Sequence, residues 1–303
     1  MTDPKTLSSI VFPDPEAKRR LAALVGVEST RDHLQKSIAL SLRPTDLDAW
    51  ARKHTEAAPA VELLKRRAPL FILGGDIGTG KTELAETIGD SVSRELDIPV
   101  YLYRLGLSAR GGGLVGEMTQ LLGAAFDQVV REASKWSEAK GPARAGAILF
   151  IDEADALAQS RETSQMHHED RAGVNALIRG IDDVARARLP IVVLMATNRL
   201  GALDPAVRRR AARVYEFKRP DEAQREDLLR RIFPALRTSS LLPQVVAATG
   251  PRGGAGYGMT YSDIVQRVVP DAVLLAFPKN ALSAEIVFEA ASSASATPPF
   301  TES

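Results

Sequence analysis

A glycine-rich loop near residue 80 is the feature that most constrains the fold of this 303-residue chain. The loop follows the apolar run Leu70 to Leu73, and its residues Gly75, Gly80, Lys81 and Thr82 have the spacing G-x-x-x-x-G-K-T. Glycines let backbone N–H groups approach a phosphate closely, and the amphipathic stretch that follows would point its helix N-terminus at the same negative charge. The sequence therefore predicts a strand, a phosphate-binding loop and a helix, in that order.

Each part of this loop has an expected task. Lys81 would reach the β- and γ-phosphates of a nucleoside triphosphate, and Thr82 would ligate Mg²⁺. We therefore expect ATP and Mg²⁺ to bind here. The predicted nucleotide-binding residues of the loop are Gly75, Asp76, Ile77, Gly78, Thr79, Gly80, Lys81, Thr82 and Glu83.

A second apolar run, in AGAILFIDEADAL, ends at the acidic pair Asp152 and Glu153. In open parallel sheets, ligands bind at the carboxyl ends of strands, so both carboxylates are expected near the phosphates. We predict that Asp152 holds Mg²⁺ through water and that Glu153 polarises the attacking water. An acidic pair after a strand can also cap a helix, but the phosphate loop earlier in the chain favours the catalytic interpretation. Together the two motifs predict an ATP-hydrolysing enzyme.

Short apolar runs alternate with longer amphipathic stretches through the middle of the chain. Runs this apolar indicate strands buried on both faces, and helical segments between them indicate a parallel sheet. The predicted fold class is α/β, a P-loop NTPase with a five-stranded parallel sheet flanked by helices and followed by a small all-helical lid domain. The predicted strands are residues 70–73, 100–103, 147–151, 191–195 and 214–217.

Changes in this pattern predict four segments. Residues 1–66 form a helical collar or linker that prolines break into short pieces, and residues 67–218 form the ATPase domain. Helical spacing without strands places the lid domain at residues 219–290. The last segment, 291–303, is small and polar, so we expect it to be a disordered tail that does not pack.

Composition excludes several classes of protein. The chain has no cysteine, which excludes disulfides, thiolate zinc sites and cysteine nucleophiles. Its 39 Lys and Arg residues balance 38 Asp and Glu residues, so bulk charge does not attract it to nucleic acid or to acidic membranes. No segment has the character of a signal peptide or a membrane span. We expect a cytoplasmic protein with no membrane partner, and the balanced charge disfavours a nucleic-acid partner while leaving a local basic patch open.

Further motifs resemble those of the AAA+ ATPases, and the resemblance extends from about Leu24 to Ala290. IVVLMATNRL is similar to the family's sensor-1 strand, which implies that Asn198 helps to position water. LDPAVRRRAARVYEF is similar to the segment with the arginine fingers, which implies that Arg209 and Arg210 reach the nucleotide of a neighbouring subunit. A solvated basic turn or a nucleic-acid patch is the alternative interpretation of this arginine run.

Three more segments are compared with the same family. LVGVES resembles the hinge that contacts adenine, which implies that Val25 and Gly26 bind the nucleotide. GMTYSDIVQRV resembles the lid motif of the AAA subgroup, which implies the same for Asp263. In the expected pore loop, ARGGGLVGEM, Leu114 stands where the family has an aromatic residue. The second pore loop falls in SRETSQMHHEDRAG, and its adjacent histidines 167 and 168 are interpreted as loop residues.

The resemblance implies a ring of six copies that uses ATP hydrolysis to remodel a protein client. RAGVNALIRGID resembles the pachytene checkpoint 2 group, which implies a HORMA-domain protein as the client and, for bacterial members, a role in anti-phage signalling. Two alternatives stay open. The chain could be a nucleic-acid-associated ATPase, such as a loader or a transposition helper, or a low-turnover scaffold that ATP controls.

Overall fold

The computed structural model describes residues 7–107, 117–137, 141–157, 167–252 and 256–300. The chain divides into two compact units, and the boundaries differ from the four predicted segments. The first unit comprises Met1–Ala23, Ser29–Gly74 and Thr82–Glu216. The second comprises Leu24–Glu28, Gly75–Lys81 and Phe217–Ser303. Most of the predicted collar therefore folds together with the sheet, and the phosphate loop groups with the helical C-terminal part.

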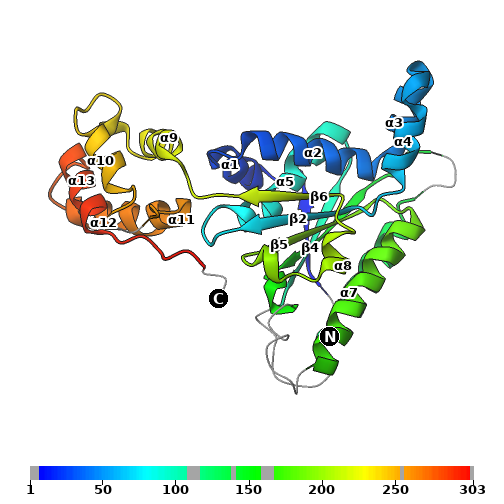
Figure 1. The fold of residues 1–303 in the computed structure, drawn as a ribbon. Coiled ribbons are helices and arrows are strands. Elements are labelled where there is room, and N and C mark those ends of the chain that lie inside the picture. Colours follow the sequence, from blue (N-terminus) through cyan, green and yellow to red (C-terminus); the bar gives the residue numbers. More distant parts are fainter. Residues whose placement is uncertain (1–6, 108–116, 138–140, 158–166, 253–255, 301–303) are drawn as a thin grey trace. The chain divides into compact units, whose positions relative to one another are not determined.

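The sheet has six strands in the order β1-β3-β4-β5-β2-β6 (Figure 1). The strands are β1 (Ser9–Phe12), β2 (Leu70–Gly75), β3 (Val100–Gly106), β4 (Gly146–Asp152), β5 (Ile191–Thr197) and β6 (Arg213–Phe217). The pairs β3–β4, β4–β5 and β5–β2 are parallel, whereas β1 runs antiparallel to β3. Every residue of β4 and β5 is buried, as expected for central strands covered on both faces.

The α/β fold with a sheet flanked by helices is confirmed, and all five predicted strands are present. The prediction missed β1, which lies within the segment predicted to be helical. This edge strand exposes Ile10 and Val11 and buries Phe12 alone, so its apolar pattern is too short to indicate a strand. The Phe12 ring packs against Gly89 and leaves no room for a side chain there. Backbone pairing with β3 rather than a local signal determines β1.

Helices cover the sheet, with α1, α2 and α5 on one side and α7 and α8 on the other (Figure 1). Leu177 and Ile181 of α7 are buried in the core that includes the sheet. The helices and helical turns up to β6 are α1 (Pro15–Ala23), α2 (Glu28–Leu42), α3 (Pro44–Lys53), η1 (Thr55–Ala57), α4 (Ala58–Lys65), α5 (Lys81–Leu96), α6 (Glu117–Ser134), η3 (Ala154–Leu157), α7 (His167–Ala187), η5 (Leu200–Ala202) and α8 (Pro205–Arg208).

The second unit has a core of its own, built by helices after β6. These are α9 (Glu222–Ile232), η6 (Pro234–Leu236), α10 (Leu242–Ala248), α11 (Tyr261–Asp263), η7 (Ile264–Val268), α12 (Val269–Ala276) and α13 (Ala284–Ser293). Val25 belongs to this core together with Leu229, Val245 and Ile264. A helical C-terminal part was predicted and is confirmed.

Two local predictions are wrong. The tail beyond residue 291 was expected not to pack, but α13 continues to Ser293 and residues 295–300 make hydrogen bonds. His167 and His168 begin α7 instead of lying in a loop. Residues 109–116 of the expected first pore loop, including Leu114, lie outside the described residues, so the interpretation of this loop stays a prediction.

Candidate nucleotide-binding site

The phosphate loop connects the end of β2 to the start of α5. Gly75, Gly78 and Gly80 have φ angles of 145°, 73° and 94°, a region that residues with a side chain rarely adopt. At Gly78 a Cβ atom would also collide with Thr260 and Ser262. The loop therefore needs glycine at these positions to keep its backbone wrapped.

Lys81 lies within the loop that it is predicted to serve. Its Nζ donates to the carbonyl oxygens of Gly75 at 2.9 Å and of Asp76 at 2.6 Å, and the residue is 5% exposed. The Thr79 hydroxyl donates to the Asp76 carbonyl at 2.7 Å. These bonds hold a buried ammonium and a small hydroxyl inside the curve of the backbone, next to the loop whose N–H groups are expected to bind phosphate.

Asp76 ties the loop to the helical C-terminal part of the same unit. Its carboxylate pairs with Arg219 at 2.6 Å and accepts from the amide of Phe300 at 3.3 Å. The Ser262 amide donates to the Gly78 carbonyl at 3.1 Å. Sequence reasoning missed Arg219, which follows β6 after a single residue and carries no motif that distinguishes it from any other basic residue.

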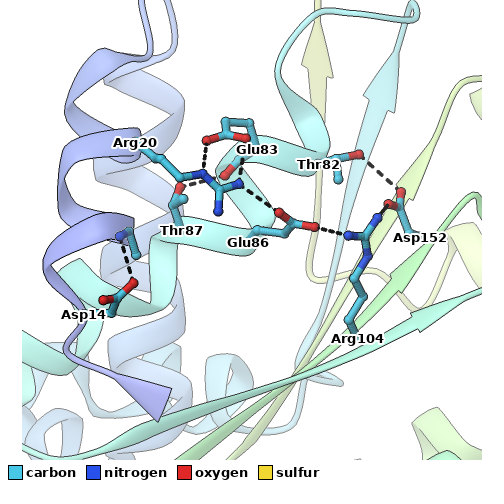
Figure 2. Close-up of polar contacts among 9 residues, drawn as sticks. Asp14, Arg20, Thr82, Glu83, Glu86, Thr87, Arg104 and Asp152 are labelled. Carbon is cyan, nitrogen blue, oxygen red and sulfur yellow. Dashed lines mark hydrogen bonds and ion pairs between the residues drawn. The ribbon is translucent and has the colours of Figure 1, made fainter. Parts of the chain in front are cut away.

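Asp152 and Thr82 come together although 70 residues separate them in the chain. Asp152 ends β4 and is 6% exposed. Its Oδ1 accepts from the Thr82 hydroxyl at 3.3 Å (Figure 2). The same oxygen accepts from the Glu153 amide at 3.0 Å. Burial raises the pKa of Asp152, and the nearby positive charge of Arg104 offsets this only in part. The carboxylate thus lies between the Thr82 hydroxyl and the Arg104 guanidinium.

The donor set around Thr82 and Asp152 fits Mg²⁺. Carboxylate and hydroxyl oxygens are hard ligands, and Mg²⁺ in proteins usually combines one or two of them with waters and substrate phosphates. Among the described residues, no group of three or more His, Cys, Asp or Glu side chains could form an all-protein metal cage. The site therefore fits a metal that binds together with a nucleotide.

Glu153 follows directly and has an unusual backbone. Its φ angle is 56°, and left-handed conformations in residues other than glycine cluster at functional sites. The residue is exposed. Its predicted role as the base that polarises water is compatible with this placement.

Asn198 follows β5, the neighbour of β4 in the sheet. The Asn198 amide donates to Oδ1 of Asp155 at 3.2 Å, and the Thr197 hydroxyl lies 3.4 Å from the same oxygen. Asp155 belongs to the short turn η3 that follows the acidic pair. It thus connects the ends of two adjacent strands. Sequence reasoning missed this residue, although it is the third acidic residue of the run IDEAD.

The two predicted finger residues differ in their surroundings. Arg210 forms a two-point ion pair with Asp182 of α7, at 2.7 and 2.9 Å, and donates to the Ala206 carbonyl at 3.0 Å. These hydrogen bonds lower the pKa of Asp182. Arg209 is exposed, and its guanidinium makes no hydrogen bond to the described residues. Arg210 is therefore held by an ion pair within the chain, whereas the Arg209 side chain is exposed.

The remaining predicted contacts lie in the second unit. Gly26 has a φ angle of 75° and is enclosed by Tyr261 and Gln224, while Val25 is buried in the core. Asp263 is 3% exposed. Its carboxylate accepts from the amide of Thr260 and from both the amide and the hydroxyl of Thr297. The side chain thus stabilises the start of α11 and the tail, and its contact with a nucleotide stays a prediction.

A cavity of about 710 Å³ lies elsewhere in the first unit. It is lined by α2, α3, α4 and the end of α7, and it contains none of the predicted nucleotide-binding residues. The cavity is therefore separate from the predicted nucleotide site, because neither the phosphate loop nor the acidic strand end lines it.

Comparisons with known proteins agree with this geometry. A model of the ATPase family associated with various cellular activities (AAA) matches residues 71–219. CD-NTase-associated protein 6 of Escherichia coli (strain MS 115-1) is 51% identical over 293 residues, 96% of this chain and 94% of that protein. A chain in the structure of the E. coli MS115-1 HORMA:CdnC:Trip13 complex is 49% identical with a TM-score of 0.88, and 98% of both chains is covered. The structure of Rhizobiales Trip13 is 40% identical with a TM-score of 0.74, covering 96% of this chain and 99% of that one.

Within the part of the chain that the structure describes, no helix is long and apolar enough to cross a membrane. The sequence resemblance to AAA+ ATPases is confirmed by the family match and by relatives that align over nearly the whole chain. The chain therefore belongs to the AAA family of ATPases.

Proposed function

We propose that this protein is a Mg²⁺-dependent ATPase that assembles into a cytoplasmic ring of six copies and remodels a HORMA-domain protein. The observation that carries the ATPase part is the convergence of the Thr82 hydroxyl on the Asp152 carboxylate, directly beside the glycine loop. This pairing supports a site in which one metal ion joins the protein to the nucleotide phosphates.

Each residue then has a defined task. Loop amides from Gly78 to Thr82 and the Lys81 ammonium bind the phosphates, and Thr82 and Asp152 hold Mg²⁺, which neutralises charge that develops on the phosphate oxygens. Glu153 accepts a proton from the attacking water, and Asn198 orients that water. Negative charge develops on the phosphate oxygens as water attacks the γ-phosphate and ADP leaves. A cation from a neighbouring copy would therefore accelerate this step. The exposed Arg209 supports that role better than Arg210, which Asp182 already holds.

The client is proposed from similarity. The E. coli relative was solved together with HORMA and CdnC proteins, and that Trip13 chain and this one match over 98% of both lengths. When ATP is hydrolysed to ADP, the conformation of the ring would change, and this change would do mechanical work on the client.

A Glu153→Gln variant tests the proposal. It should bind ATP, hydrolyse it at least about 100-fold more slowly than the wild type, and retain a purified HORMA-domain protein on a size-exclusion column. Lys81→Ala is the matched control. It should not bind ATP, and adding ATP should not increase its binding to the client.

Three results would redirect the function. Normal hydrolysis by Glu153→Gln would remove that residue from its role. A wild-type rate equal to that of Lys81→Ala would favour the low-turnover scaffold. Hydrolysis that DNA stimulates and salt suppresses steeply would favour the nucleic-acid-associated ATPase.

A further inference from the structure

A chain of alternating charges connects helix α1 to the proposed metal site (Figure 2). Arg20 of α1 pairs with Glu83 at 2.7 Å and with Glu86 at 2.9 Å, both on α5. Glu86 in turn pairs with Arg104 of β3. Arg104 then pairs with Oδ2 of Asp152 at 2.9 Å. Glu86, Arg104 and Asp152 therefore link Arg20 of the N-terminal helix to the position where Asp152 is proposed to hold a cation.

Arg104 occupies a position that packing does not explain. It is the exposed residue of β3, and its side chain is 51% exposed while the residues on either side of it are buried. One nitrogen of its guanidinium donates to Glu86 and the other to Asp152. A guanidinium has a planar fork of donors, so two of its nitrogens can each bind a different carboxylate.

Two cations cannot share the Asp152 carboxylate without cost. Arg104 neutralises the charge that Mg²⁺ would use, and a divalent ion placed beside the guanidinium would repel it. Glu86 offers Arg104 a second acceptor, and it is 15% exposed and fixed by Arg20 from the other side. A small shift of the guanidinium toward Glu86 would therefore release Asp152 and keep Arg104 paired.

We propose that Arg104 is a positioning residue that competes with Mg²⁺ for Asp152, and that Glu86 is the acceptor that retains Arg104 when the metal binds. The inference rests on the proposed function, because it requires Asp152 to hold the metal. It assigns Arg104 and Glu86 a measurable effect on metal binding, separate from the chemical step.

The test measures the affinity of the full chain for a non-hydrolysable ATP analogue by calorimetry, with Mg²⁺ and with EDTA. The ratio of the two affinities reports the coupling between metal and nucleotide. Arg104→Gln should raise this ratio about two- to fivefold, the range expected for loss of a half-exposed ion pair. Arg94→Gln is the matched control, since Arg94 pairs with Asp90 on α5 and does not contact Asp152.

A double-mutant cycle separates direct contact from a general change of charge. Glu86→Gln should lower the ratio in the wild-type background and leave it unchanged in the Arg104→Gln background, because Glu86 acts through Arg104. An equal effect of Glu86→Gln in both backgrounds would overturn the inference. So would a ratio that Arg104→Gln leaves unchanged or lowers.

The same measurements distinguish this inference from the proposed function. If the wild type binds the analogue equally well with Mg²⁺ and with EDTA, or not at all, then the metal site itself is wrong. If the wild type depends on Mg²⁺ but Arg104→Gln responds as the Arg94→Gln control does, only the competition fails.

Discussion

Replacing Arg209 and Arg210 separately by alanine should affect two different properties. Arg210→Ala removes a two-point pair with Asp182 and a hydrogen bond to the Ala206 carbonyl. The pair is partly exposed, with 24% and 40% of the two side chains accessible, so it contributes about 0.5–1 kcal/mol. The carbonyl bond adds about 0.5–1.5 kcal/mol. Together the loss is about 1–2 kcal/mol, which lowers Tm by about 2–8 °C in a chain of this size.

Arg209→Ala should leave stability within about 0.5 kcal/mol, because the Arg209 side chain is exposed and makes no hydrogen bond to described residues. Its effect should fall on hydrolysis. Arginine fingers change rates by about 10³-fold or more, so steady-state ATPase activity should nearly disappear while nucleotide affinity remains. Thermal unfolding and ATPase rates of both variants, measured at the same protein concentration, separate the two roles.

Mixing variants then tests whether the finger acts across subunits. An Arg209→Ala subunit keeps Glu153, and a Glu153→Gln subunit keeps Arg209, so mixed rings contain interfaces at which every catalytic group is present. Activity should recover on mixing two inactive preparations. Absence of recovery, or an Arg209→Ala protein with the wild-type rate, would refute the assignment of Arg209 as the finger.

Three further predictions concern single residues. Gly78→Ala should abolish nucleotide binding in calorimetry, because the added side chain collides with Thr260 and Ser262 and strains a backbone with φ of 73°. Asp155→Ala should lower the hydrolysis rate about tenfold or more with little change in affinity, since it frees the backbone of Asn198. Asp263→Ala should lower the free energy of unfolding by about 2–4 kcal/mol at pH 7. Burial raises the pKa of Asp263, but hydrogen bonds, chiefly from Thr297, outweigh burial and lower the pKa below its usual 3.8. The stability that the Asp263 carboxylate contributes is therefore present above pH 3.8 and is lost as the pH falls through the lower pKa of the folded protein. In urea unfolding, the stability of the wild type should approach that of the variant in acid.

Local motifs account for what the sequence could predict. The backbone conformation of the loop requires the glycine spacing, and burial of the strands requires the apolar runs. Each of these patterns can be recognised within about ten residues of sequence. The strands and the helical C-terminal part follow from them. The prediction of β1 failed because a four-residue edge strand with one buried side chain has no such local pattern.

Partners distant in sequence account for the rest. Arg219, Asp155 and Arg104 are ordinary charged residues in the sequence, and their contacts exist because strands bring them to the site. The tail was expected to stay free because it is small and polar, yet hydrogen bonds rather than apolar packing hold Thr297 to Asp263. Composition predicts burial of apolar surface, but it does not predict a polar segment held by one buried carboxylate.

The order of the strands explains why these charged residues converge. Because β3, β4 and β5 are adjacent and parallel, their carboxyl ends carry Arg104, Asp152 and Asn198 to one edge of the sheet. Asp152 is held from one side by Arg104, and Asn198 is held through its backbone by Asp155. In the proposed mechanism the first contact yields to a metal ion, whereas the second positions a backbone group and is given no part in metal binding. Substitution of Arg104 should therefore change how the metal binds, and substitution of Asp155 should change how fast the bound nucleotide reacts.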